Sequence, residues 1–213
     1  MTAILVTGVP RSGTSAVAGV IYHLGVHMGN TFVALGDMNP RGSFEGVLTT
    51  QTFAAMTDTV GMRDLLQAFS DGSSDGRCPY LLLDVFRIWA KEYPLWGFKE
   101  IRLLVPGLFD EMVSFISEFD TVRVIGTRRS IEASGRSVHN RYHDLHDLDP
   151  VTACQVGQDR LQEILDRTDS RLVDYDCLID DTVSEVHGIA EWLGVPFQQG
   201  AVDFIEPTLR RCG

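Results

Sequence analysis

Residues 3–15 of this 213-residue chain have the sequence AILVTGVPRSGTS, and this stretch decides the fold. Ala3 to Val6 is a short, wholly apolar run, which is typical of a strand buried on both faces of a parallel sheet. Thr7-Gly8 ends the run, and residues 16–24 have the small and apolar side chains of a helix. The order strand, glycine-rich loop, helix predicts a site where backbone N–H groups converge on an anion, helped by the positive end of the helix dipole.

The loop at residues 8–15, GVPRSGTS, has two glycines separated by four residues and then two hydroxyl side chains. The nucleotide-triphosphatase form of such a loop requires a lysine after the second glycine, where this chain has Thr14. Arg11 is the nearby cation that can replace that lysine, because its planar fork can bind two oxygens of one tetrahedral group. The predicted anion-binding residues are Gly8, Pro10, Arg11, Ser12, Gly13, Thr14 and Ser15.

Strands and helices alternate along the rest of the chain. Further strands are predicted at residues 95–99, 121–127 and 171–175, and helices at 49–66, 80–91, 108–119, 130–142, 151–167 and 182–193. Two polar, glycine-rich stretches separate them, an extended loop at 28–46 able to close over a site and a linker or surface loop at 67–79. Strands that alternate with helices of this length predict one α/β domain over residues 1–213, with a parallel sheet flanked by helices.

Composition excludes several classes of protein. With 44% hydrophobic and 22% charged residues, the chain is not intrinsically disordered. Its 18 Lys and Arg against 29 Asp and Glu give a net charge of −11, which opposes the coating of nucleic acid or an anionic membrane. The chain start lacks the pattern of a signal peptide, and no window approaches the roughly 18 apolar residues that span a bilayer.

The cysteines indicate a reducing environment. The four cysteines, Cys78, Cys154, Cys177 and Cys212, are scattered and have no metal-ligand spacing. Reduced thiols in a cytoplasmic protein are therefore predicted.

The sequence leaves the oligomeric state open.

A second anion site is predicted after the strand at residues 121–127. Arg128 and Arg129 follow this strand, and Ser137 lies eight residues beyond Arg129 on the next helix. An arginine at a strand end and a serine on a helix can hold one phosphate between a charge-assisted bond and a hydroxyl. Arginine at a helix N-terminus opposes the helix dipole, and a bound anion would relieve this placement. The predicted pair is Arg129 with Ser137, and Arg128 is the alternative to Arg129.

The loop GVPRSGTS resembles the 5′-phosphosulfate loop of the sulfotransferases that use 3′-phosphoadenosine 5′-phosphosulfate (PAPS), in which Lys or Arg stands at the place of Arg11. The spacing of Arg129 and Ser137 resembles the family's 3′-phosphate site, although the proline often found after the arginine is absent. Three further segments are similar to bacterial members of the family. They are residues 39–45 (NPRGSFE, against NPxGxxE), residues 96–102 (WGFKEIR, against WGxKDPR), and residues 171–178 with the later LGVP turn at 193–196.

The resemblance implies a P-loop fold with three layers, α/β/α, and in-line transfer of a sulfuryl group from PAPS to a hydroxyl or amine of a small molecule, glycan or peptide. The product nucleotide is adenosine 3′,5′-bisphosphate, and no metal is required. Glu45 is the candidate base, and a solvated loop carboxylate is the alternative interpretation of it. Lys99 ends a predicted strand at the edge where open α/β sheets bind ligands, so we expect it to stabilise the bridging oxygen together with Arg11. An ion pair of Lys99 with Glu100 or Asp84 is the alternative.

A histidine is the other possible base. His139, His143 and His146 fall on one face of a helix, where they span about 10 Å and cannot all reach one metal ion. Two other functions stay open: a P-loop phosphotransferase, because residues 81–84 (LLLD) resemble a hydrophobic run that ends in a magnesium-binding aspartate, and a sulfonucleotide-binding protein without turnover. Thr14 in place of lysine and the helical pattern of residues 85–91 argue against the phosphotransferase.

Overall fold

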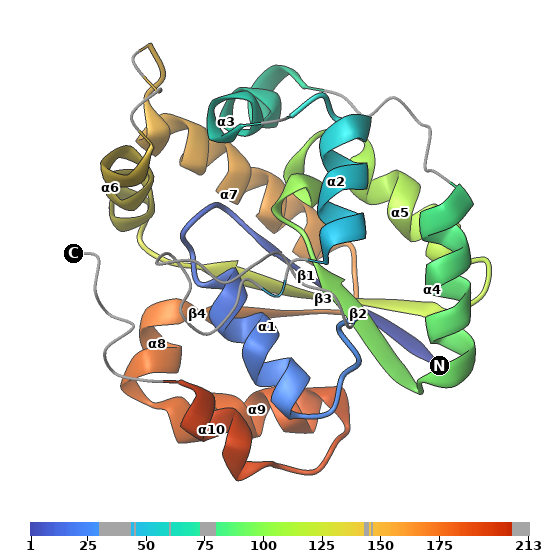
Figure 1. The fold of residues 1–213 in the computed structure, drawn as a ribbon. Coiled ribbons are helices and arrows are strands. Elements are labelled where there is room, and N and C mark those ends of the chain that lie inside the picture. The colour runs from blue at the N-terminus through green and yellow to red at the C-terminus, as the bar shows by residue number, and fades with distance from the viewer. Residues whose placement is uncertain are drawn as a thin grey trace.

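Four parallel strands form one sheet at the centre of the molecule, in the order β2-β1-β3-β4 (Figure 1). The computed structural model describes residues 1–29, 44, 46–59, 61–72, 80–142, 145 and 147–205. The strands are β1 (Thr2–Gly8), β2 (Leu95–Lys99), β3 (Thr121–Arg128) and β4 (Ser170–Asp174). All four strands were predicted from the sequence, and the parallel α/β class is confirmed.

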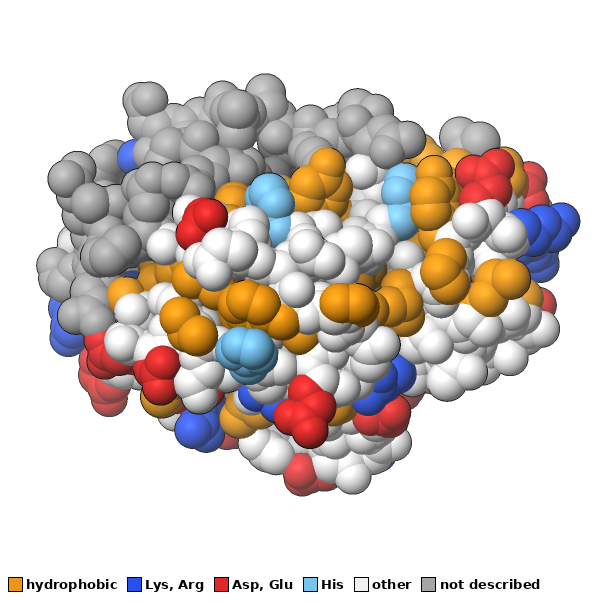
Figure 2. Space-filling model, turned by 90° about the horizontal axis from the view of Figure 1, so that it is seen from below, with side chains coloured by type: hydrophobic (Ala, Val, Ile, Leu, Met, Phe, Trp, Pro, Cys, Tyr) orange, Lys and Arg blue, Asp and Glu red, His pale blue; other side chains and the backbone are white. Residues whose placement is uncertain are grey.

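Helices cover both faces of this sheet and make a three-layer structure (Figure 1). One face carries α1 (Thr14–His23), α8 (Tyr175–Asp180), α9 (Thr182–Leu193) and α10 (Gln199–Phe204). The other face carries α2 (Val47–Met56), α3 (Met62–Asp71), α4 (Tyr80–Glu92), α5 (Leu108–Ile116), α6 (Ile131–Arg141) and α7 (Pro150–Asp166). A short 3-10 helix, η1 (Ile101–Leu104), follows β2. Figure 2 shows apolar and histidine side chains across the middle of the α1 face, with most charged side chains toward its margin.

Strand β1 is buried on both faces because it lies between β2 and β3. Ala3 and Leu5 belong to the core under α7, whereas Ile4 and Val6 belong to the core under α1. All four side chains have no exposed surface, which explains why the strand lacks the polar alternation of an edge strand. Because β1 is central, the loop that follows it opens in the middle of the carboxyl edge of the sheet.

Two of the sequence predictions differ from the structure. The single helix predicted at 49–66 is two helices, α2 and α3, because the chain turns at residues 57–61. There the Thr57 hydroxyl bonds the Phe53 carbonyl, and Asp58 takes a left-handed backbone conformation with φ 50°. Such side-chain bonds to the backbone compete with helix continuation. The predicted linker at 67–79 begins too early, because residues 67–71 complete α3; residues 73–79 lie outside the described part of the chain.

Three short elements were not predicted, namely η1, α8 and α10. Helix α8 has only six residues, and the Asp174 side chain caps it by accepting bonds from the backbone N–H groups of Asp176 and Cys177. A segment this short has too few residues to show a helical period. Most of the predicted loop at 28–46 lies outside the described residues, and α2 begins right after it.

His27 lies in an aromatic cluster where the chain after α1 meets β2. Its ring stacks on Tyr93, with centroids 3.7 Å apart, and meets Trp89 edge-on at 5.1 Å. Its backbone pairs with the β2 edge, since the N–H of His27 donates to the Leu95 carbonyl and the N–H of Gly97 donates to the His27 carbonyl. Burial lowers the pKa of His27, and the nearby Glu92 carboxylate raises it by a smaller amount.

We expect His27 to make the fold less stable in mild acid. Its pKa is lowered in the folded state, so as the pH falls below its ordinary value of 6.5 the unfolded chain takes up a proton that the folded chain does not yet bind. The stability contributed by neutral His27 is therefore present above this pH and is lost as the pH falls. Urea unfolding at pH 7.5 and pH 5.5 measures this loss. The His27→Phe variant keeps a ring against Tyr93 but cannot titrate, so its loss must be smaller than that of the wild type; an equal loss contradicts this role.

Candidate functional site

The loop after β1 is held in shape by two residues with left-handed backbone conformation. Arg11 has φ 67° and Gly13 has φ 96°, and Gly13 is the N-cap of α1. The N–H groups of Ala16 and Val17 donate to the Gly13 carbonyl at 2.9 and 3.1 Å. A Cβ at Gly13 would lie 2.2 Å from the Tyr175 ring, so both backbone conformation and space require glycine here.

A close approach between β1 and β3 fixes the other end of the loop. A Cβ at Gly8 would lie 2.3 Å from the Thr127 hydroxyl and 2.5 Å from the Thr127 carbonyl. The Thr127 hydroxyl shares a hydrogen bond of 2.8 Å with the Ser12 hydroxyl, and both residues are fully buried. The N–H of Ser12 donates to the Val9 carbonyl. Ser12 thus shapes the loop from inside, and its binding of an anion stays a prediction.

The start of α1 offers backbone donors at the carboxyl edge of the sheet. Thr14 and Ser15 are its first two residues, and the first N–H groups of any α-helix have no carbonyl partner within the helix. The first turn of α1 contains no acidic side chain, so nothing in it opposes an anion at this positive end of the helix dipole. Pro10, within the loop, is buried.

Arg11 and Ser137 lie in direct contact. The Arg11 Nε–H donates to the Ser137 Oγ at 3.1 Å, although the two residues are 126 positions apart in the sequence. Ser137 comes from α6 and is 5% exposed, whereas Arg11 is half-buried. The structure therefore brings the arginine of the first predicted anion site together with the serine of the second.

The two arginines at the carboxyl end of β3, Arg128 within it and Arg129 after it, are both paired with carboxylates. Arg128 Nε lies 3.1 Å from Asp174 Oδ2, and Arg129 Nε lies 3.6 Å from Asp176 Oδ1. Asp174 ends β4 and Asp176 lies in the first turn of α8. These ion pairs relieve the unfavourable placement of arginine before α6, so that placement no longer argues by itself for a bound anion.

Arg129 is the arginine more closely connected to the loop. Its side chain is 12% exposed, against 52% for Arg128, and its guanidinium lies 5.3 Å from the centre of the Tyr175 ring that packs on Gly13. A hollow of about 570 Å³ opens beside both arginines. Its lining residues are Arg128, Arg129, Ser130, Ile131, Gln158, Asp159, Gln162, Asp174 and Asp176. That Arg129 binds a phosphate, with Arg128 as the alternative, stays a prediction.

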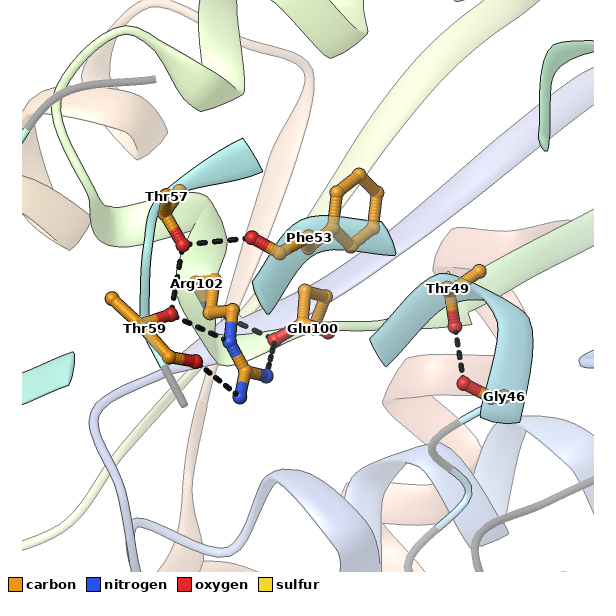
Figure 3. A network of polar contacts seen from close by, with 7 residues as sticks. All are labelled: Gly46, Thr49, Phe53, Thr57, Thr59, Glu100 and Arg102. Atoms are coloured by element: carbon orange, nitrogen blue, oxygen red, sulfur yellow. Dashed lines mark hydrogen bonds and ion pairs between the residues drawn. The ribbon is translucent and has the colours of Figure 1, made fainter. Parts of the chain in front are cut away.

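Lys99 lies at the carboxyl end of β2, opposite Val6 of β1 and therefore close to the start of the loop. Its side chain is 3% exposed. Of the two carboxylates named as alternative partners, Glu100 accepts hydrogen bonds from Arg102 (Figure 3) and Asp84 pairs with Arg87, and the role of Lys99 at the bridging oxygen stays a prediction. Asp84 also lies within helix α4, as the sequence indicated, so the LLLD segment is not the strand of a magnesium site.

Several predicted residues lie outside the described chain. Glu45 is among them, although its neighbours Phe44 and Gly46 are described, and so are His143 and His146. His139 lies on α6 and is exposed. In the described residues, no three or more His, Cys, Asp or Glu side chains are grouped to hold a metal ion. A search of the same residues found no helix long and apolar enough to cross a membrane.

The sequence analysis missed three residues that shape this site, namely Thr127, Tyr175 and Arg102. Thr127 ends the predicted strand at 121–127, and its parallel neighbour Gly8 was the available signal. Tyr175 follows a strand end, the position from which open α/β folds present side chains to ligands. Arg102 follows the predicted strand at 95–99, yet its partner Thr59 is 43 positions away and gave no signal.

Comparison with known proteins identifies the fold. No protein-family model matches the chain, and no curated protein matches it in sequence. Among solved structures, it is similar to the sulfotransferase domain of the olefin synthase from Synechococcus PCC 7002, with a TM-score of 0.58 and 17% identity over 97% of this chain and 78% of that chain.

Two more solved structures have the same fold. The sulfotransferase domain from the curacin biosynthetic pathway has a TM-score of 0.58 and 14% identity, covering 95% of this chain and 77% of that one. The sulfotransferase STF1 from Mycobacterium tuberculosis H37Rv has a TM-score of 0.52 and 16% identity, covering 95% and 70%. The chain therefore has a sulfotransferase-like α/β fold, as the resemblance implied.

We expect Gly13→Ala to destabilise the protein much more than Gly25→Ala. Both glycines have φ 96°, so both variants carry the cost of a left-handed alanine, about 1–2 kcal/mol. Only at Gly13 does the added Cβ also meet the Tyr175 ring, since nothing lies within 4 Å of a Cβ at Gly25. Denaturant unfolding of both variants measures the difference. Equal losses of stability would show that Tyr175 does not pack on the loop in solution.

Proposed function

We propose that the chain is a sulfotransferase that moves a sulfuryl group from PAPS to a hydroxyl or amine of its acceptor. The observation that carries this proposal is the hydrogen bond between Arg11 and Ser137. The first residue comes from the loop proposed to bind the 5′-phosphosulfate, and the second from the helix proposed to bind the 3′-phosphate. Their contact supports one nucleotide bound by both segments, within one domain.

The residues around this contact fit a nucleotide with anionic groups at both ends. The N-terminus of α1 and Arg11 supply donors and positive charge for the 5′ end. Ser137 with Arg129, or with Arg128, would bind the 3′-phosphate. The net charge of −11 means that the anion must be held by local cations and not by the overall field of the protein.

In the proposed reaction the acceptor oxygen or nitrogen forms a bond to sulfur while the bond from sulfur to the 5′-phosphate oxygen breaks. The bonding electron pair leaves with that oxygen, on adenosine 3′,5′-bisphosphate. Lys99 and Arg11 would stabilise the negative charge that develops there, and such preorganised charge is the main contribution that a protein makes to group transfer of this kind. Glu45 would take the acceptor proton, with a histidine as the alternative base.

The described cysteines support a location in a reducing compartment, which we propose to be the cytoplasm. Cys154 and Cys177 are free thiols. Burial raises the pKa of Cys154 to about 12, so this thiol is inert at neutral pH.

We expect Arg11→Ala to lower transfer roughly 10²–10³-fold while the fold is retained. Loss of one charge-assisted donor at a developing oxyanion costs roughly 10²–10³ in turnover. Activity is measured as transfer of the radiolabelled sulfuryl group from PAPS to a panel of phenols, alcohols and amines. Calorimetric titration measures the binding of adenosine 3′,5′-bisphosphate. Arg11→Lys is the matched variant, because it keeps the charge and loses the fork. Undiminished transfer by Arg11→Ala would refute the role of this side chain.

These assays, together with a measurement of magnesium-dependent ATP or GTP turnover, separate the proposal from its rivals. A phosphotransferase would turn over ATP or GTP with magnesium and would not bind the bisphosphate without metal. A binding protein without turnover would take up the bisphosphate tightly and transfer sulfate to nothing in the panel. A wild-type protein that does not bind the bisphosphate would sink the sulfotransferase assignment.

We expect Asp176→Asn to tighten the binding of adenosine 3′,5′-bisphosphate on the order of fivefold. Asp176 pairs with Arg129, so its charge competes with an incoming phosphate, and two charges at about 4 Å in water interact by about 1 kcal/mol. Asp169→Asn is the matched control. Asp169 is also 58% exposed and also pairs with an arginine, Arg123, but at the amino edge of the sheet. Weaker binding by Asp176→Asn would mean that Asp176 orients Arg129 for the phosphate.

A further inference from the structure

A buried network of hydrogen bonds joins the end of α2 to the carboxyl end of β2 (Figure 3). Arg102 is its centre. The guanidinium donates from Nη1 to Glu100 Oε1 at 3.0 Å, from Nε to the Thr59 hydroxyl at 2.9 Å, and from Nη2 to the Thr59 carbonyl at 3.5 Å. The Thr59 hydroxyl bonds the Thr57 hydroxyl at 2.8 Å, and the Thr57 hydroxyl donates to the Phe53 carbonyl in α2.

The network lies out of water. The side chains of Arg102 and Glu100 are 12% and 1% exposed, and Thr57 and Thr59 are buried. A buried ion pair costs desolvation, so stability alone is a weak reason for its presence, and an apolar pair of similar volume is often as stable. What such a pair does provide is direction, because the arginine fork fixes two partners in one plane.

One end of the network is tied to the strand that carries the loop. The N–H of Glu100 donates to the Val6 carbonyl of β1 at 3.0 Å, two residues before Gly8. Glu100 also follows Lys99 directly in the chain. The Glu100 carboxylate accepts the N–H of Arg102 and so caps η1. The position of Arg102 is therefore set by the same strand end that presents Lys99.

The other end of the network is α2, which begins two residues after Glu45, the residue proposed to take the acceptor proton. This helix begins at Val47, immediately after Phe44, Glu45 and Gly46, and ends where Thr57 joins the network. In its described residues, α2 packs in the core through Phe53 and Met56, with Leu48 against it, and the Phe53 ring centroid lies 5.6 Å from that of Phe98 in β2. Apolar burial is non-directional whereas hydrogen bonds have a preferred geometry, so the network adds a defined orientation to this packing.

We propose that Arg102 is a positioning residue that holds α2, and with it the acceptor side of the site, in register with the carboxyl end of β2. This inference rests on the proposed sulfotransferase function. Arg102 acts through Glu100 and Thr59 and touches neither donor nor acceptor. The donor-binding residues, Arg11 and Ser137, are held by separate contacts, so loss of the Arg102 network should affect the acceptor and spare the nucleotide.

Arg102→Lys is the variant that tests this role. The single ammonium of lysine can still pair with Glu100, but it cannot hold Glu100 and Thr59 in the fork geometry of arginine. We expect kcat/KM for the acceptor to fall at least tenfold, because small misplacement of a reacting group costs up to about 10²-fold. The dissociation constant of adenosine 3′,5′-bisphosphate should stay within twofold of the wild type. The acceptor used is the member of the phenol, alcohol and amine panel with the highest wild-type turnover.

Arg123→Lys is the matched control for a general loss of stability. Arg123 is 19% exposed and also holds two partners, Asp169 and the Trp192 carbonyl, but it lies near the amino end of β3. We expect this variant to lose comparable thermal stability and to keep the acceptor kinetics of the wild type. If Arg123→Lys lowers acceptor kcat/KM as much as Arg102→Lys, Arg102 is merely structural and the proposal is wrong.

Hydrogen exchange supplies a readout that needs no acceptor. We expect the amides of α2 to exchange at least tenfold faster in Arg102→Lys, and those of α1 to be unchanged. If Arg102→Lys does not fold, Thr59→Val removes the hydroxyl partner instead. Thr182→Val in α9 is its control, since the Thr182 hydroxyl donates to the Leu178 carbonyl on the opposite face of the sheet from α2. Unchanged exchange in α2 overturns the proposal. Failure of the wild type to bind the bisphosphate overturns the sulfotransferase function instead, and the exchange result still decides whether Arg102 holds α2.

Discussion

The close contact between Gly8 and Thr127 is the constraint on which the rest of the site depends. No side chain fits at position 8, because a Cβ there would overlap the Thr127 hydroxyl and carbonyl. The Ser12 hydroxyl lies beside Gly8 and bonds the Thr127 hydroxyl, and the residue before it in the loop, Arg11, bonds Ser137 of α6. The position of the loop cation is thus determined by packing between two neighbouring strands and not by the loop alone.

The site places positive charge locally in a protein that is acidic overall. This positive charge is partly balanced nearby, because Arg128 pairs with Asp174 and Arg129 pairs with Asp176. An anion in the adjoining hollow gains attraction from the arginines and meets repulsion from those carboxylates. Affinity in such a site depends on the balance of both signs, so it can be tuned by changes in either set of residues.

The sequence predicted the strands well because each is a short apolar or β-branched run between turn signals, as in residues 3–6 and 121–127. It identified Arg11 as the candidate loop cation because residues 8–15 contain no other lysine or arginine, and the binding of an anion by Arg11 stays a prediction. It did not predict the partners of Arg128 and Arg129, because Asp174 and Asp176 lie 46 and 47 positions away and are brought close only by the pairing of β3 with β4. It also joined α2 and α3 into one helix, since the turn at Thr57 to Thr59 is stabilised by side-chain bonds and not by a proline.

Tyr175 gives the two halves of the site a common mechanical support. Its ring fills the space over Gly13 on one side and lies beneath the Arg129 guanidinium on the other. A shift of the ring would therefore disturb both neighbours together, because close-packed interiors transmit such displacements. In the proposed function these two neighbours belong to the segments that bind opposite ends of one nucleotide, so a rigid aromatic spacer would set their separation, and a molecule of a different length would have to displace it.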